Sequence, residues 1–171
     1  ANAEREATHS AMLPFTRNLF DPMDFTPMVL GDIPDRQRRT SNGFQLALPV
    51  LFTSGLQHLV TTPEQMAEMP GFVQEYLRDV PAMWDDSRFV SGYPGRYVTI
   101  ARRAGDRWYV VAIHAGPDVR RFAPDLSFTG RERGQLITDG ASWRKPAQRD
   151  VALNGFDIEL EPGTGFILII E

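Results

Sequence analysis

The side chains best suited to chemistry in this sequence are three histidines and a small number of carboxylates. His9, His58 and His114 lie far apart and show no H-x-x-x-H spacing, so they form no metal-binding motif. His58 follows an apolar segment and His114 ends a predicted strand, which favours structural roles for both. His9 precedes another apolar segment and neighbours Glu4 and Glu6, and the sequence leaves open whether it lies in a site.

The carboxylates offer two candidate pairs. Asp85 and Asp86 are adjacent on a predicted strand, where neighbouring side chains point to opposite faces, so capping or turn formation is the favoured role. Asp21 and Asp24 lie in a loop broken by prolines, close to Arg17. Such a loop can present both carboxylates to a ligand, and an Arg–Asp pair that only shapes the loop is the alternative.

Composition excludes several classes of function. The chain has 171 residues, 42% of them hydrophobic, and a net charge of −4, which argues against a nucleic-acid surface. The short basic cluster of Arg36, Arg38 and Arg39 is predicted to be a solvated loop. There are no cysteines, no G-x-S-x-G motif and no apolar run long enough to cross a membrane. The first residue is not Met and no signal peptide is visible, so we expect a fragment or a processed product.

The segment Trp84–Gly116 dominates the predicted architecture. It contains three β-branched and aromatic runs separated by the turn sequences Gly92–Gly95 and Ala104–Asp106, where glycine supplies the positive φ of a tight hairpin. Both faces are largely apolar, so this ribbon is expected in the middle of a sheet.

Helical patterns precede this ribbon. Met12–Thr16 is predicted to be a short buried strand, and Ser41–Val60 a helix buried on most sides and kinked at Pro49. Thr62-Pro63-Glu64-Gln65 has the form of a capping box that opens a short helix, and Gly71–Val80 is a further helix that ends before proline.

Strand patterns follow the ribbon. We expect strands within 118–128 and 134–138, a half-buried strand over 156–161 and a central strand over 166–170. Many short strands with Gly/Pro turns predict a β-sandwich. The change of period places a domain boundary between Pro81 and Asp86 and makes the chain α+β.

Several segments, taken in order, resemble glycoside hydrolase family 97. Leu13–Asn18 and Pro22–Pro27 are similar to the carboxyl end of that family's catalytic barrel, as are the residues from Arg39 to Gln57. Val80-Pro81, Trp84–Arg88, Pro94-Gly95, Tyr97-Val98, Ile100–Arg103 and Trp108–Val110 resemble its passage into the C-terminal β-domain. Pro49 and Tyr93 depart from the family pattern.

The resemblance implies that residues 1–83 are the last strand and helices of a (β/α)8 barrel, and that residues 84–171 are an antiparallel β-sandwich. Family members are calcium-dependent, exo-acting glycosidases, either inverting α-glucosidases or retaining α-galactosidases. The general acid and the calcium-binding glutamates are then expected upstream of Ala1, so this chain holds no catalytic residue or metal ligand and is inactive alone. His9, Arg17 and Asp24 are the candidates for the rim of the sugar pocket.

The same resemblance sets the expected partners. These are an oligosaccharide substrate, the missing N-terminal and barrel portions of the enzyme and a homo-oligomer, without nucleic acid or membrane, in the periplasm or outside the cell. The sequence leaves open which sugar is released and with which stereochemical outcome. A barrel remnant should also expose an apolar patch, drawn from Met12, Leu13, Phe15, Phe44, Leu48 and Phe52, around an unpaired strand near Leu13.

A rival hypothesis is a non-catalytic β-sandwich module that binds glycans or mediates domain or oligomer contacts. Sugar-binding platforms need aromatic faces in solvent. Trp108 is predicted to lie in the core, whereas Trp143, in a polar loop, is the tryptophan that could be exposed.

Overall fold

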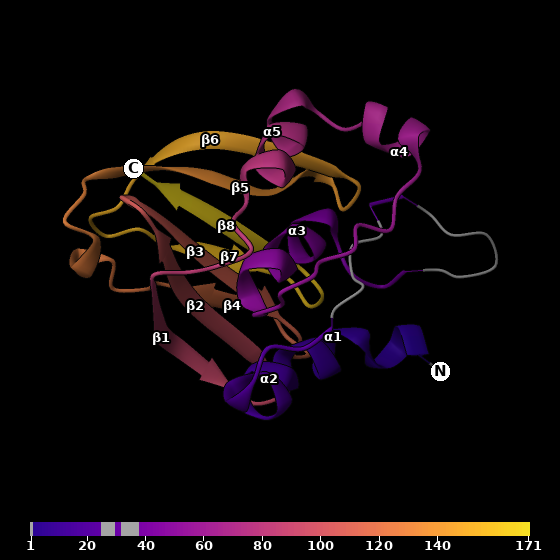
Figure 1. The fold of residues 1–171 in the computed structure, drawn as a ribbon, viewed down its shortest axis with the longest axis horizontal. Helices are drawn as coiled ribbons and strands as arrows, with labels where there is room; N and C mark the ends of the chain where they lie inside the picture. The colour runs from indigo at the N-terminus through magenta and orange to yellow at the C-terminus, as the bar shows by residue number, and fades with distance from the viewer. Residues whose placement is uncertain (1, 25–29, 32–37) are drawn as a thin grey trace.

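The computed structural model describes residues 2–24, 30–31 and 38–171. Helices α1, α3 and α5 pack on one face of a six-stranded sheet, and a two-stranded sheet covers part of the other (Figure 1). The helical elements are α1 (Asn2–Met12), the 3-10 turn η1 (Leu13–Phe15), α2 (Arg17–Phe20), α3 (Asn42–Leu51), α4 (Pro63–Ala67), α5 (Gly71–Asp79) and η2 (Ser127–Thr129). The strands are β1 (Asp86–Tyr93), β2 (Tyr97–Ala104), β3 (Arg107–His114), β4 (Arg120–Phe122), β5 (Arg133–Ser142), β6 (Lys145–Ala152), β7 (Ile158–Leu160) and β8 (Gly165–Ile170).

The large sheet is antiparallel throughout, with strand order β1-β2-β3-β8-β5-β6. The predicted ribbon is confirmed as β1, β2 and β3, and Gly95 and Gly105 adopt φ of 72° and 59° in its two turns. β8 is central, as predicted, between β3 and β5. The expected central position of the whole ribbon is wrong, because β1 is an edge strand with mostly exposed or half-buried side chains.

The two faces of the sheet bury separate cores, which the alternation along β3 makes visible. Tyr109, Val111 and Ile113 pack in the core shared with the helices. Trp108 and Val110 belong to the other core, beside β4, η2 and β7. The fold is therefore a mostly antiparallel β-sandwich with a helical layer on its outer face.

Helix α3 lies at the centre of the helical layer, and every one of its residues is buried. A buried helix needs partners for its first four N–H and last four C=O groups. At the start, the N–H groups of Ser41, Asn42, Gly43 and Phe44 donate to Gly163 O (2.8 Å), Trp143 O (2.7 Å), Asp139 Oδ1 (2.8 Å) and Ser41 Oγ (3.0 Å). The amino end of the helix is therefore satisfied mainly by Ser41 and by groups from the β5–β6 hairpin.

At the carboxyl end of α3, Arg102 of β2 supplies donors for two of the last four carbonyl groups. Its Nε donates to Val50 O at 2.6 Å and its Nη2 to Leu51 O at 3.0 Å. The remaining two carbonyls accept from Phe52 N (Leu48 O, 3.0 Å) and Gln57 Nε2 (Pro49 O, 2.9 Å). Burial lowers the pKa of Arg102 to about 10, so the guanidinium is protonated at neutral pH. A cation at this end also complements the helix dipole.

Three predictions for the N-terminal half are wrong. The strand predicted over residues 12–16 is absent: Met12 ends α1, and Leu13–Phe15 form η1. An apolar run of five residues is too short for its sequence to distinguish a strand from a helix. The helix expected over Ser41–Val60 ends at Leu51, where Arg102 occupies its carboxyl end. Half of the expected apolar patch is missing, because Phe44, Leu48 and Phe52 are buried against the sheet. Met12 remains 36% exposed, and Leu13 and Phe15 are half-buried.

Other predictions agree with the structure. Thr62 and Gln65 form the capping box of α4, and α5 covers the helix predicted before Pro81. Residues 91–171, all described, contain no helix longer than the 3-10 turn η2. Sequence reasoning missed β6, a polar edge strand, and α1. The exact domain division at residue 83 stays a prediction. None of the helices in the described part of the chain is long and apolar enough to span a membrane.

Candidate functional site

The three residues predicted to line a sugar pocket are all exposed and belong to neighbouring parts of the N-terminal segment. His9 lies on α1, Arg17 opens α2 and Asp24 follows it. The Arg17 guanidinium donates at 3.5 Å to the carbonyls of Asp21 and Pro22. Among the described contacts there is no ion pair between Arg17 and Asp24. Their role at a sugar pocket stays a prediction.

The other polar residues noted in the sequence have structural roles. Asp85 Oδ2 accepts from Gly105 N at 2.7 Å, so Asp85 stabilises the β2–β3 turn as expected. Asp86 opens β1, and its Oδ1 accepts from Ser87 N of the same strand at 2.8 Å. His114 is buried, and its Nε2 lies 2.6 Å from Asp118 O.

His58 and the basic cluster of Arg36, Arg38 and Arg39 differ from what the sequence predicts or lie partly outside the described residues. His58 was expected to be structural but is exposed in the loop after α3. Of the basic cluster, Arg36 lies outside the described residues, whereas Arg38 is half-buried and donates to Asn42 Oδ1 at 2.5 Å.

Carboxylates gather at one small hollow, between α5 and the strands β3, β5, β6 and β8. Its volume is about 190 Å³, and Glu75, Asp79 and Glu171 line it together with Arg107. All three carboxylates are exposed, and Glu171 forms an ion pair with Arg107. A glycosidase acid must remain protonated near neutral pH, which burial usually achieves. This hollow does not provide that environment.

No group of three or more His, Cys, Asp or Glu side chains comes together as a possible metal site within residues 2–24, 30–31 and 38–171. The side chains described therefore do not fit a calcium ion.

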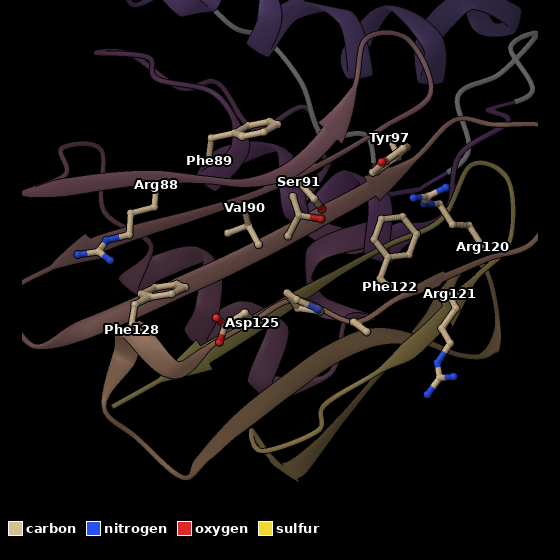
Figure 2. A pocket seen from close by; sticks show the side chains of 13 residues that line it. Arg88, Phe89, Val90, Ser91, Tyr97, Arg120, Arg121, Phe122, Asp125 and Phe128 are labelled. Atoms are coloured by element: carbon tan, nitrogen blue, oxygen red, sulfur yellow. The ribbon is translucent and has the colours of Figure 1, made fainter.

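A groove of about 560 Å³ lies on the sandwich face opposite the helices. Figure 2 shows its side chains: β1 contributes one wall, and the segment from β4 to η2 contributes the other. Val90, Tyr97 and Phe122 pack in the core beneath the groove. The ring of Phe89 instead lies on the other side of β1, against Phe15 at 5.7 Å between centroids (Figure 2).

Three arginines line this groove, and each is held differently. Arg88 contacts the rings of Trp108 and Phe128, with its Cζ 5.4 and 5.0 Å from their centroids, and pairs with Asp86 at 3.4 Å. Arg121 is paired with Asp157. Arg120 stacks on Tyr97, with its Cζ 3.7 Å from the ring centroid.

Asp125 supplies the carboxylate of the groove, between the Arg88 and Arg120 ends (Figure 2). Its Oδ1 accepts from Ser127 N at 2.9 Å. Hydrogen bonds from the backbone and side chain of Ser127 hold the pKa of Asp125 below its ordinary value. The groove therefore combines guanidinium donors, a charged carboxylate and apolar walls.

A second hollow, of about 530 Å³, continues from the first and shares Tyr97 and Arg120 with it. It is lined further by Tyr93, Arg96, Asp118 and the buried His114. Tyr93 is 63% exposed. The two hollows together form what we call the two-lobed groove, with the Arg120–Tyr97 stack at the point where they meet.

The sequence did not predict this groove, because its two walls come from segments about thirty residues apart in the chain, β1 and the segment from β4 to η2. Trp143, the tryptophan expected to be exposed, is 38% exposed but lies elsewhere, beside Gly163. Trp108 is buried, as predicted.

Comparison with known proteins gives a match over most of the chain. A family model described as "Glycosyl-hydrolase 97 C-terminal, oligomerisation" matches residues 83–171. A probable retaining alpha-galactosidase of Streptomyces bingchenggensis is 37% identical over 134 residues, which cover 78% of this chain and 21% of the relative. A retaining alpha-galactosidase of Bacteroides thetaiotaomicron is 31% identical, over 97% of this chain and 28% of its own length.

Solved structures match nearly the whole chain. The crystal structure of a beta-arabinopyranosidase superposes with a TM-score of 0.91 at 31% identity, covering 99% of this chain and 28% of that one. A glycoside hydrolase family 97 enzyme from Pseudoalteromonas sp. strain K8 gives a TM-score of 0.80 at 25% identity, over 95% of this chain and 28% of that enzyme. The chain therefore spans about a quarter of the length of the proteins that it matches.

Proposed function

The chain belongs to glycoside hydrolase family 97, and from this premise we propose that it is the C-terminal part of an exo-acting α-glycosidase whose catalytic carboxylates lie upstream. The observation that carries the proposal is the extent of the match. Relatives and solved structures align with 95–99% of the chain, well beyond the family model that begins at residue 83. Residues 1–82 thus have counterparts in the region that precedes the C-terminal domain of these enzymes.

We propose terminal α-linked galactose as the substrate, with α-linked glucose as the alternative. Both curated relatives are named as retaining α-galactosidases. Retaining hydrolysis uses two carboxyl groups about 5–5.5 Å apart, one as nucleophile and one as acid and base. The carboxylates at α5 are exposed, whereas a glycosidase acid depends on burial to stay protonated, and this supports an upstream position for the catalytic pair.

For residues 1–83 we propose the last part of a (β/α)8 barrel, and for His9, Arg17 and Asp24 the rim of its sugar pocket. The described elements of this segment are helical. Arg17 and His9 lie at the surface, and both carry N–H groups that can donate to sugar hydroxyls. The contacts of the Arg17 guanidinium with Asp21 O and Pro22 O are long, at 3.5 Å, so a ligand can compete with them.

A chimera tests the proposed activity. The chain replaces the corresponding C-terminal region of the Bacteroides thetaiotaomicron relative, and hydrolysis of an aryl α-galactoside is measured. We expect turnover by the chimera and none by the 171-residue chain. In the chimera, Arg17→Met should raise KM for the galactoside, whereas Arg133→Met, far along the chain on β5, should not. Turnover by the chain alone overturns the proposal.

Calcium, oligomerisation and location complete the proposal. We propose that calcium is bound by carboxylates outside this chain, so EDTA should abolish the activity of the chimera and added calcium restore it. The family model describes its domain as an oligomerisation domain. We therefore propose a homo-oligomer, to be measured by light scattering. We also propose a periplasmic or secreted location, which fractionation of the source cells tests.

A further inference from the structure

We propose that the two-lobed groove is a non-catalytic binding site for a neutral oligosaccharide, the chain that carries the sugar removed by the enzyme. The inference rests on the proposed function for its substrate class, and on the groove for its location. The groove lies on the β4–β7 side of the sandwich, across the large sheet from α3 and the rest of the N-terminal helices (Figures 1 and 2).

The size and shape of the groove fit a chain-like ligand. The lobes measure about 560 and 530 Å³, and each lies within the range of about 300–1,000 Å³ typical of small-molecule sites. They share Tyr97 and Arg120, so a ligand can extend from one lobe into the other past this stack. An oligosaccharide is such an extended ligand, with a sugar ring available for each lobe.

The polar groups of the groove suit hydroxyls. A sugar hydroxyl both donates and accepts, so it binds best between an acceptor such as carboxylate and a donor such as guanidinium. Asp125 provides the charged acceptor in the first lobe. Arg120 provides donors at the junction, where stacking on Tyr97 fixes its position. Among the described ion pairs none involves Arg120, so its N–H groups remain available to a ligand.

Aromatic and apolar surfaces complete the site. Tyr93 exposes most of its side chain in the second lobe, and Phe128 and Val90 line the first lobe. Such surfaces pack against the C–H faces of pyranose rings. Arg88 and Arg121 are neutralised by their ion pairs with Asp86 and Asp157. The other two arginines of the groove, Arg96 and Arg120, are balanced by the carboxylates Asp118 and Asp125, so the lining carries no excess charge and suits a neutral ligand.

The binding experiment uses the 171-residue chain, which we expect to have no catalytic activity. The chain is titrated with the α-galactosyl trisaccharide raffinose, and binding is measured by NMR. We expect saturable shifts of Tyr93, Arg120 and Asp125 amides, with a Kd near 1 mM, which is typical of weak recognition. Arg120→Gln and Asp125→Asn should each weaken binding at least about fivefold. Arg149→Gln is the matched control, because Arg149 is an exposed arginine on β6, at the opposite edge of the sheet from β1, and it lines neither lobe.

Three results overturn the site. One is the absence of shifts at tens of millimolar raffinose, and another is equal weakening by Arg149→Gln and Arg120→Gln. The third is self-association of the chain that is abolished by Arg120→Gln and unaffected by sugar. That result would assign the groove to contact with a second copy of the chain. Failure of the chimera to hydrolyse galactosides, with binding intact, would refute the proposed function and leave the groove standing.

Discussion

Replacement of Arg102 by methionine should strongly destabilise the fold, because this side chain serves the carboxyl end of the central buried helix. The guanidinium donates to Val50 O and Leu51 O, and its Nη1 donates to Ser87 Oγ at 2.6 Å. Methionine has similar length and fills the same space without donors. Both carbonyls then stay buried without a partner.

The magnitude follows from those two acceptors. An unsatisfied buried group costs about 1–3 kcal/mol, and removal of a buried cation returns part of its desolvation penalty. We expect a net loss of about 2–4 kcal/mol in the free energy of unfolding. Arg102→Lys should lose less, since it keeps the charge but not the fork of donors.

Urea unfolding of the chain, followed by tryptophan fluorescence, measures this loss. With a slope of about 1–3 kcal/mol per molar, the midpoint should fall by about 1 M or more. The neighbouring Arg103 is the control, because its partners, Gly105 O and Asp85, lie at the surface. Arg103→Met should change stability by less than about 1 kcal/mol. If Arg102→Met is as stable as Arg103→Met, the account of α3 is wrong.

Three further changes probe the same layer. Tyr76→Phe removes the buried hydroxyl that donates to Leu46 O at 2.7 Å, and calorimetry should show a loss of about 1–2 kcal/mol. Gly43→Ala places a Cβ 2.5 Å from Gly165 O, so α3 must shift away from β8 at a cost of about 1–3 kcal/mol in the free energy of unfolding. Urea unfolding measures this loss, and an unchanged midpoint would contradict the close packing of α3 on β8. Burial raises the pKa of Asp139 above its ordinary 3.8, so its protonation stabilises the fold fully below pH 3.8, and this contribution is lost as pH rises through the folded pKa. The stability of the wild type relative to Asp139→Asn should therefore increase as pH falls from 7 towards 3.8, and a flat difference would contradict this.

Local chemistry made much of the fold predictable. Thr62 and Gln65 carry a capping box within four residues, and Gly95 and Gly105 mark turns that need positive φ. The continuous apolar runs of β3 and β8 also predict buried strands without tertiary information.

Tertiary contacts explain what sequence reasoning could not predict. The end of α3 depends on Arg102, which lies about fifty residues away in the chain. β6 is polar because it is an edge strand, so its sequence lacks the apolar pattern that identifies the others. The groove exists only where β1 and β2 meet the segment after β3, and no local motif records that contact.

The central claim is that this chain is the C-terminal part of a family 97 glycosidase whose catalytic carboxylates lie outside it. The most direct measurement is the rate of aryl α-galactoside hydrolysis by the purified 171-residue chain, at high protein concentration and with calcium present. We predict a rate no higher than that of buffer, because a general acid alone contributes about 10²- to 10⁴-fold and the nucleophile is absent as well. A protein-dependent rate that survives repurification, and that falls when Glu75 or Asp79 is replaced by its amide, would contradict the claim by placing the catalytic pair at α5.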